Sequence, residues 1–325
     1  VLGDLCRDAE DGRYDAATAA YAEAVTGQAL PAEFLGDGPP LAQQTVMLRE
    51  SRRFHGPIGH LAQAVNAGNL PRAAELLRQP GDELHVAHPA TPQRVVRIAA
   101  EGREGAPGGY GLYLREVLAR PGDPADFEPW VVRVLQAFER FRVLCAVREG
   151  DWGAQGLNIA IERALVAAGL LHKPAPNALW YEGRPVMVTR NDAGIGVFNG
   201  DIGIVLRPPG HEGKGEGLRA WFLDGTVPRS VSVSRLAEVE TAFAMTVHKS
   251  QGSEFEHTLL ALPDQGGSVL TRELVYTGIT RARQRFTLAS GAPHNFAMAL
   301  AQRTRRASGL LELLSVTPAR ERFRS

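Results

Sequence analysis

The sequence predicts an α/β protein with a small β-barrel inserted into it. Apolar runs of strand length alternate with helical patterns before residue 174 and again after residue 240. Between these parts lie four or five β-type runs without a helical pattern, which is typical of a small barrel. Within them, Asn199-Gly200 indicates a hairpin, since a type I′ turn needs positive φ at both positions.

The N-terminal part contains helical patterns and one predicted strand. Residues 1–35 are rich in Ala at helical spacing, and the apolar run in 45–54 predicts a short strand that enters a basic turn. Apolar residues at helical spacing predict a helix over 58–69. We expect mostly loop over 78–108, because Gly, Pro and His are frequent there and periodicity is weak.

Helices and strands alternate through the middle of the chain. Helical patterns fill 110–140 and 156–170, with an apolar strand over 140–149 between them. The predicted barrel strands are 184–191, 194–206, 218–224 and 229–236.

The α/β pattern resumes near the C-terminus, with a strand and polar turn over 243–255, a strand over 257–263, a helix over 270–284, a strand over 285–290 and a basic helical tail from 292. The polar turn is expected at the sheet edge where α/β folds hold ligands. Gly278 inside the predicted helix costs about 1 kcal/mol relative to Ala, which indicates close packing. Arg281 lies two positions after Ile279, so helical geometry turns it away from the apolar stripe.

Composition excludes several classes of protein. Lys+Arg and Asp+Glu both number 36 and 44% of residues are hydrophobic, which excludes a disordered chain and a polybasic chromatin-like protein but not local nucleic-acid binding. Cys6 and Cys145 lack CxxC spacing, so we expect no disulfide framework, no thiolate metal site and a cytoplasmic location. No signal peptide or long apolar run is visible, and no membrane partner is expected.

Two segments carry the strongest signal. AMTVHKSQGSEF (244–255) and ELVYTGITRAR (273–283) resemble the last two motifs of superfamily 1 DNA helicases and, more narrowly, those of the exodeoxyribonuclease V alpha-subunit (RecD) family. Further matches follow in order: VLGDLC, LRESRRFHGPIGHLAQAVNAGN, LCAVREGDWGAQGLNIAIE and WYEGRPVMVTRNDAGIGVFNGDIGIVL. The resemblance covers essentially the whole chain and implies the C-terminal part of such a subunit, a RecA-like second motor domain of the P-loop NTPase type with an SH3-like insertion.

The resemblance implies a role in ATP hydrolysis. Arg53 and Arg281 match the arginines that reach the γ-phosphate from the second motor domain. A guanidinium there neutralises charge that develops in phosphoryl transfer, an effect of about 10³–10⁵ in rate. Glu254 matches the acid near the nucleotide sugar, Gly252 would allow close backbone approach, and Gln251 belongs to the same cofactor-binding segment.

The resemblance also implies contact with single-stranded DNA. Lys249 would contact phosphate without reading sequence, while Thr246 and His248 would position the strand. Phe198 in the insertion could stack on a base or fill a small core. The implied DNA-binding residues are Thr246, His248, Lys249, Arg190, Asn191, Phe198 and Asn199.

One departure from the family is an absence. The sequence contains no GxxxxGK[ST] and no acidic pair after an apolar strand to hold Mg²⁺. ATP with Mg²⁺ is the implied cofactor, and we expect its phosphate loop and metal carboxylates upstream of Val1. The chain alone is therefore not expected to hydrolyse ATP. His85 and His88 form an HxxH without a third ligand nearby, so no metal site is predicted.

The predicted organisation has three parts: 1–182, a remnant of the first motor domain leading into the second; 183–237, the SH3-like insertion; and 238–325, the rest of the second motor domain. The implied function is that of a 5′→3′ helicase subunit, active in double-strand-break repair by homologous recombination. Its implied partners are DNA ends and the beta and gamma subunits of exodeoxyribonuclease V. Two alternatives stay open, a stand-alone RecD-like helicase and a non-catalytic DNA-binding or assembly module.

Overall fold

The computed structural model describes residues 6, 9, 11–47, 56–79, 81–103, 105–106, 108–209 and 217–304. The chain divides into two compact units, Val1–Arg52 with Thr304–Ser325, and Arg53–Arg303.

The first unit is built of short helices. Its described elements are α2 (Ala16–Thr26), η1 (Ala32–Phe34) and η2 (Ala42–Gln44). The Asp15 side chain accepts from Thr18 N at 2.7 Å and begins α2. No regular structure forms over 45–47, where Val46 is 75% exposed, and the rest of the strand and turn predicted over 45–54 lies outside the described residues. An apolar run needs a partner strand and a core to bury it, and the described residues give Val46 neither.

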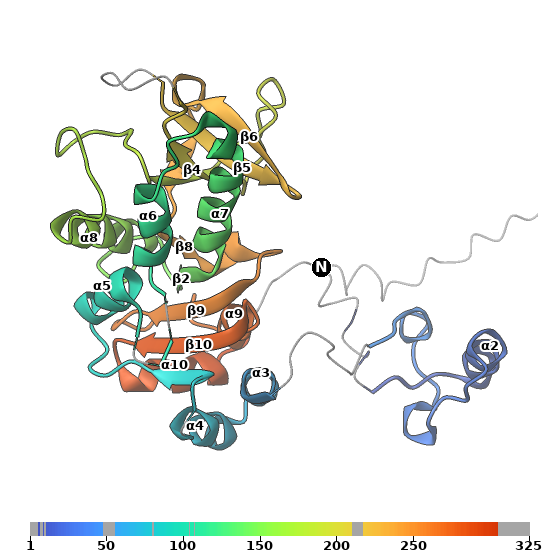
Figure 1. Cartoon of the computed structure of the whole chain (residues 1–325). Helices are drawn as coiled ribbons and strands as arrows, with labels where there is room; N and C mark the ends of the chain where they lie inside the picture. Colours follow the sequence, from blue (N-terminus) through green and yellow to red (C-terminus); the bar gives the residue numbers. More distant parts are fainter. Residues whose placement is uncertain are drawn as a thin grey trace, which may run out of the picture. The chain divides into compact units, whose positions relative to one another are not determined.

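A parallel sheet forms the centre of the second unit (Figure 1). Its strand order is β1-β10-β9-β2-β8, and every neighbouring pair is parallel. The strands are β1 (Leu84–Val86), β2 (Phe141–Cys145), β8 (Ala244–Thr246), β9 (Phe255–Leu262) and β10 (Ala282–Ser290). The expected α/β architecture with a parallel sheet is confirmed.

Helices cover both faces of this sheet, because its strands are apolar on both sides. Along β9, Leu259 and Ala261 point into one core, and Leu260 and Leu262 into the other. The first core is covered by α5 (Pro92–Glu101), α6 (Gly111–Leu118), α7 (Phe127–Glu139, after η3, Pro124–Asp126) and α8 (Ala154–Ala167). The second is covered by α3 (Gly56–Asn66), α4 (Leu70–Arg78), α9 (Arg272–Ile279) and α10 (Pro293–Ala301). None of the helices described is both long and apolar enough to traverse a bilayer.

Two predictions about local structure are wrong. The region 78–108 contains strand β1 and helix α5, although loop was expected. Thr91 begins α5 by accepting from Arg94 N at 3.1 Å, whereas β1 exists only because it pairs with β10, distant in sequence. The helix predicted over 270–284 ends at Ile279, because from Ala282 the chain pairs with β9 as strand β10.

A second, antiparallel sheet has the order β6-β5-β4-β3-β7. Its core includes Val186, Val205 and Phe222. The strands are β3 (Pro185–Val188), β4 (Ile202–Leu206), β5 (Arg219–Asp224), β6 (Val227–Ser232) and β7 (Val239–Thr241), with η4 (Val233–Arg235) before β7.

The connection from β3 to β4 is longer than a tight hairpin. It runs over 189–201, and only a single bridge, Asp192 with Val197, forms within it. Gly200 has φ +97°, but Asn199 has no positive φ, so the predicted type I′ turn is wrong. The extra residues form a projecting loop, the 189–201 loop, which carries all four candidate DNA-binding residues of the predicted insertion.

Candidate functional site

The predicted site residues lie at two different edges of the parallel sheet. Strand β8 ends at Thr246 and β9 begins at Phe255, and both are parallel to β2, which lies between them. Residues 247–254, which include η5 (Val247–Ser250), must therefore cross from the edge where β2 and β8 end, the carboxyl edge, to the edge where β9 and β10 begin, the amino edge. The expectation that the whole turn lies at one edge is wrong.

Arg281 lies at the amino edge, in the turn between α9 and β10, and not on a helix as the sequence pattern predicted. Its Nη1 donates to the Ser253 carbonyl at 3.0 Å and its Nε to the Thr277 carbonyl at 3.2 Å. The Arg281 carbonyl accepts from Phe255 N at 2.8 Å. This half-buried arginine therefore ties the last turn of α9 to the segment that precedes β9.

Two glycines fit this arrangement. Gly278 lets α9 pack closely on β9, since an added Cβ would meet Leu260 Cδ1 at 3.0 Å; the predicted close packing is confirmed. Gly252 has φ +89°, and nothing lies within 4 Å of the position its Cβ would take. The Gly252 backbone is thus open on this side, beside the Ser253 carbonyl that Arg281 holds.

The other predicted nucleotide residues lie close by in the chain. Gln251 is exposed at the end of η5, and Glu254 is half-buried immediately before β9. Gly252 and Glu254 flank Ser253, whose carbonyl accepts from Arg281, and so lie next to Arg281 at the amino edge. Arg53 lies outside the described residues.

At the carboxyl edge, Thr246 ends β8 opposite Cys145, and His248 and Lys249 are exposed in η5. Lys249 Nζ lies 2.7 Å from the Glu240 carboxylate, and Arg148 Nη2 lies 2.8 Å from the same group. Lys249 is therefore already paired within the protein. Sequence reasoning missed Arg148 and Glu240. Arg148 lies in the loop after β2 and Glu240 on β7 of the other sheet, and no sequence pattern links the two residues.

Asn158 on α8 is a second residue that sequence reasoning missed. Its Nδ2 donates to the Ala244 carbonyl at 2.8 Å, and its Oδ1 accepts from Ala244 N at 2.9 Å. The side chain thereby satisfies the outer edge of β8 as a neighbouring strand would. Its position in the segment GAQGLNIAIE, which resembles the helicase family, was the available signal.

A hollow of about 420 Å³ opens beside these residues. Its walls come from α8, β3, β7, β8 and the loop after β2, and they include Arg148, Ile159, Met187, Thr246 and Lys249. It therefore brings Thr246 and Lys249 together with Arg148, while His248 is not among its lining residues.

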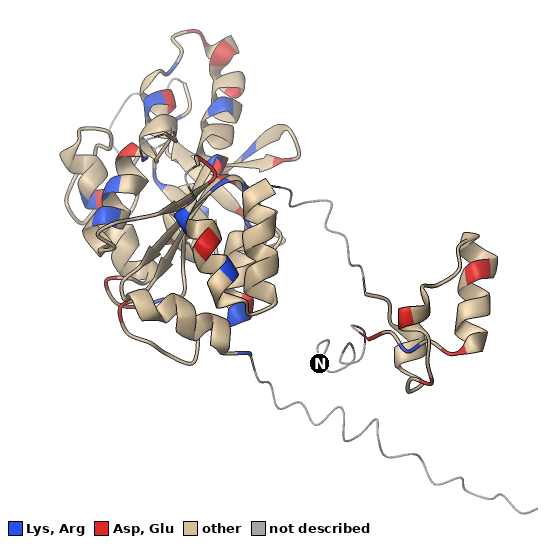
Figure 2. Ribbon diagram, turned by 90° about the horizontal axis from the view of Figure 1, so that it is seen from below, with Lys and Arg blue, Asp and Glu red and all other residues tan. Residues whose placement is uncertain are grey.

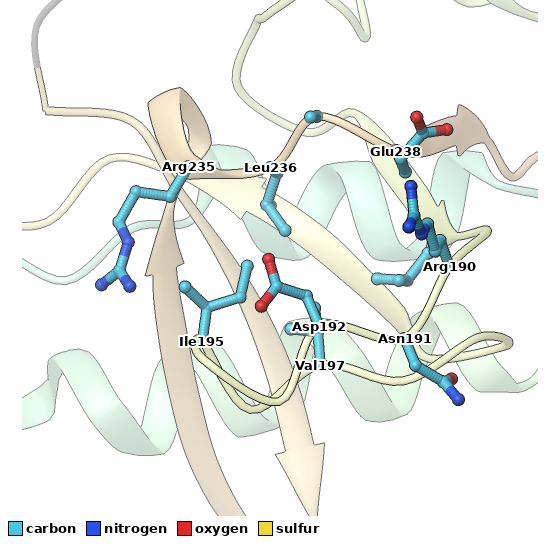
Figure 3. A pocket seen from close by; sticks show the side chains of 10 residues that line it. Arg190, Asn191, Asp192, Ile195, Val197, Arg235, Leu236 and Glu238 are labelled. Carbon is cyan, nitrogen blue, oxygen red and sulfur yellow. The ribbon is translucent and has the colours of Figure 1, made fainter.

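Arg190 and Asn191 of the 189–201 loop line another hollow, of about 400 Å³, whereas Phe198 and Asn199 are not among its lining residues. Figure 3 shows Asp192, Ile195 and Leu236 pointing toward its centre, with Arg190 and Arg235 on opposite sides. Asn191 Oδ1 accepts from Asn199 N at 2.8 Å, so this pair first serves to hold the loop. Phe198 is 53% exposed and thus accessible.

Charge does not mark a single binding face. Basic and acidic residues are interspersed over the helices and strands of the described chain (Figure 2). Among the described residues, no group of three or more His, Cys, Asp and Glu side chains is placed to hold a metal ion.

These residues fit one side of a nucleotide site. The amino edge offers a guanidinium, Arg281, and an open glycine backbone at Gly252. A phosphate loop would cradle several phosphate oxygens with successive backbone N–H groups, and the sequence contains no such motif. The groups that this edge offers are therefore a positive charge and an open backbone.

Comparisons with known proteins agree with the motifs. Residues 241–289 match the UvrD-like helicase C-terminal domain. The chain is 36% identical over 271 residues to RecBCD enzyme subunit RecD of Mycobacterium tuberculosis, which covers 83% of this chain and 43% of that protein. It is 33% identical over 327 residues to the RecD of Haemophilus influenzae, covering 97% of this chain and 47% of the relative.

A more distant relative is the ATP-dependent RecD2 DNA helicase of Deinococcus radiodurans, 34% identical over 183 residues, which covers 56% of this chain and 24% of that protein. Among solved structures, the Bacteroides Pif1 helicase with ADP-AlF3 and single-stranded DNA aligns with a TM-score of 0.41 and 10% identity, covering 83% of this chain and 56% of that one. That likeness is too low to carry an argument. The chain spans less than half the length of the RecD relatives it matches.

Proposed function

The chain is similar to the C-terminal part of RecD along most of its length, and we propose that it forms the second, RecA-like motor domain of a superfamily 1 DNA helicase. The antiparallel sheet would form its SH3-like insertion, with β3 to β6 inside 183–237 and β7 (Val239–Thr241) just after it. The proposed parts are those expected from the sequence, 1–182, 183–237 and 238–325.

The observation that carries this proposal is the placement of Arg281. Its guanidinium is fixed at the amino edge by two backbone carbonyls, next to the open backbone of Gly252. ATP with Mg²⁺, bound mainly by the first motor domain, would supply the γ-phosphoryl group for hydrolysis. Arg281 would neutralise charge that develops there, and its hydrogen bonds reduce the entropy lost in positioning it.

Arg53 is proposed as a second arginine of the same cleft. It precedes α3, which begins at Gly56. An added Cβ at Gly56 would lie 3.3 Å from the Glu83 carboxylate, and Glu83 immediately precedes β1. Helix α3 thus begins on the side of the sheet where Arg281 lies, which supports a shared role.

The carboxyl edge would carry the single-stranded DNA. Thr246, His248 and Lys249 would contact its backbone, and the 189–201 loop would extend the track through Arg190 and Phe198. Because residues 247–254 join the two edges directly, a shift of the nucleotide-side residues would move the DNA-side residues as well. Cycles of cleft closure and opening would thereby advance the strand.

In the cell, we propose a 5′→3′ helicase subunit working with beta and gamma subunits of an exodeoxyribonuclease V on DNA ends, in the cytoplasm, during recombinational repair. The alternative of a stand-alone helicase is supported by the shorter RecD2 match. A non-catalytic DNA-binding module is the second alternative, since the sequence contains no phosphate-loop motif.

The test is to measure DNA-stimulated ATP turnover by this chain alone and after adding a separate polypeptide that carries the first motor domain of RecD. We expect no turnover alone and turnover in the mixture. DNA binding without turnover in the mixture would favour the non-catalytic module. Turnover by the isolated chain would contradict the division of the ATP site between two domains.

A further inference from the structure

The hollow at the carboxyl edge holds a three-residue charge cluster that bridges the two sheets. Glu240 on β7 accepts from Arg148 at 2.8 Å with one carboxylate oxygen and from Lys249 at 2.7 Å with the other. The three side chains stay partly exposed, at 61% for Arg148, 35% for Lys249 and 37% for Glu240. Ion pairs this exposed contribute little to stability, about 0–1 kcal/mol each, so they can exchange partners at low cost.

The backbone beneath these cations is held firmly. The carbonyls of Val147 and Arg148 accept from Ala154 N and Gln155 N, at 3.1 and 2.9 Å, and so join the Arg148 loop to the first turn of α8. Asn158, one turn further along α8, holds β8 through both polar groups of Ala244. The backbone of the Arg148 loop, and of the strand that leads to Lys249, is therefore held by contacts that do not involve Glu240.

The hollow also has an apolar wall. Ile159 of α8 is 53% exposed there, and Met187 and Met245 lie buried at its base. An aliphatic wall next to two cations suits a nucleotide, whose base needs an apolar face and whose phosphate needs positive charge.

We infer that Arg148 and Lys249 form a phosphate-binding pair for one nucleotide of single-stranded DNA, and that Glu240 occupies this pair when DNA is absent. The inference rests on the proposed function and adds to it Arg148 as a DNA contact and Glu240 as a competitor. The phosphate of the bound strand displaces the Glu240 carboxylate from both cations. When the strand leaves, Glu240 pairs with Arg148 and Lys249 again. DNA binding at this position is therefore an exchange of one anion for another, which weakens it and allows rapid release.

The experiment measures binding of a fluorescent 20-nucleotide dT oligomer to the full 325-residue chain over a range of salt concentrations. In Glu240→Gln the two cations have no carboxylate to leave, so we expect tighter binding at low salt. The slope of log affinity against log salt should become steeper by up to about 0.7, the increment for one phosphate neutralised on a single strand. Glu128→Gln, which removes an exposed carboxylate from the first turn of α7, is the matched control and should behave as the parent chain.

A second pair of variants guards against a folding defect in Glu240→Gln. Adding Arg148→Ala to Glu240→Gln should remove part of the extra slope, because only Lys249 then remains to neutralise the phosphate. Arg148→Ala alone should bind no more tightly than the parent chain. An unchanged slope in Glu240→Gln, with unfolding like that of the parent, overturns the inference while leaving the proposed function intact. Failure of the parent chain to bind the oligomer at any salt concentration overturns both.

Discussion

The amino edge of the parallel sheet and the 189–201 loop carry candidate functional residues in opposite ways. At the amino edge, Arg281 is half-buried and fixed by the carbonyls of Ser253 and Thr277. On the loop, Phe198 is 53% exposed, and the loop is held by hydrogen bonds of its own, such as that from Asn199 N to Asn191. A fixed charge suits a reaction that needs exact geometry, whereas an exposed ring suits a strand that must slide.

The parallel sheet and the 189–201 loop should also differ in what a substitution changes. The parallel sheet also contains Arg142, which is fully buried between the rings of Phe138 and Phe255, at 4.0 and 4.8 Å from their centroids. Substitutions there should affect hydrolysis or the fold, and substitutions on the loop should affect DNA binding alone. Four measurements test this difference.

The largest effect is expected from Arg281→Ala in a complete subunit. Hydrolysis should fall by about 10³-fold or more, because charge in the transition state loses its partner, while nucleotide and DNA still bind. The lost hydrogen bonds to the Ser253 and Thr277 carbonyls and to Thr280 Oγ1 should also cost about 1–3 kcal/mol of unfolding free energy. Turnover and thermal unfolding are measured on the same samples.

Arg283→Ala is the matched control for Arg281, since it removes an exposed arginine two residues away. It should retain turnover and stability close to those of the parent. Parent-like turnover in Arg281→Ala would make that arginine only a structural link between α9 and β9.

The next effect concerns stability of the parallel sheet. Arg142→Ala should lower the free energy of unfolding by about 3 kcal/mol, because it empties the space between two rings and removes the 3.0 Å hydrogen bond to the Ala242 carbonyl. Arg142→Met keeps most of the volume and should lose less, about 1 kcal/mol. Equal losses in denaturant titrations would show that charge, and not packing, determines the effect.

On the loop, Phe198→Ala should weaken binding of single-stranded DNA by about 1–3 kcal/mol if the ring stacks on a base. Unfolding should change by less than about 0.5 kcal/mol, because the ring is exposed. Val227→Ala, which removes a 63% exposed side chain from β6, is the control and should leave binding unchanged. A large loss of stability in Phe198→Ala would mean that the loop is part of the core.

The smallest effect, over the range from pH 7 to 5, is a pH dependence of the free energy of unfolding that arises in the parallel sheet. Burial lowers the pKa of His257 to about 3, and Arg103 and Arg285 add to the shift. The unfolded chain takes up this proton near pH 6.5, so protonation favours unfolding. The contribution of neutral His257 to the free energy of unfolding is fully present above pH 6.5. Below that pH it should fall by about 1 kcal/mol per pH unit toward pH 3. Denaturant titrations from pH 7 to 5 should show a shallower decline in His257→Gln; the same decline in both proteins would exclude His257 as its source.

Several structural features could be predicted from local sequence. Helix α3 follows from apolar residues at helical spacing, and Gly278 indicated the close packing of α9 on β9. Strand β1 could not be predicted, because three residues become a strand only beside β10. The end of α9 was missed for the same reason, since pairing with β9 begins at Ala282 and overrides the helical pattern.

The candidate site divides in a similar way. The motif segments identified Arg281, Gly252 and Lys249 as functional candidates, but not Arg148, Glu240 or Asn158 as their neighbours. Those neighbours come from α8, β7 and the loop after β2, and their contacts exist only after both sheets have formed.

The amino-acid sequence by itself determined the class of the fold, the resemblance to RecD-type helicases and which side chains can supply positive charge, because periodicity and motifs are local properties of the chain. Only the tertiary structure decided that residues 247–254 connect opposite edges of one sheet and that Lys249 already has an anionic partner. The segment 247–254 must cross the sheet because β8 and β9 run in the same direction. Lys249 has an anionic partner because β7, which carries Glu240, lies close to η5.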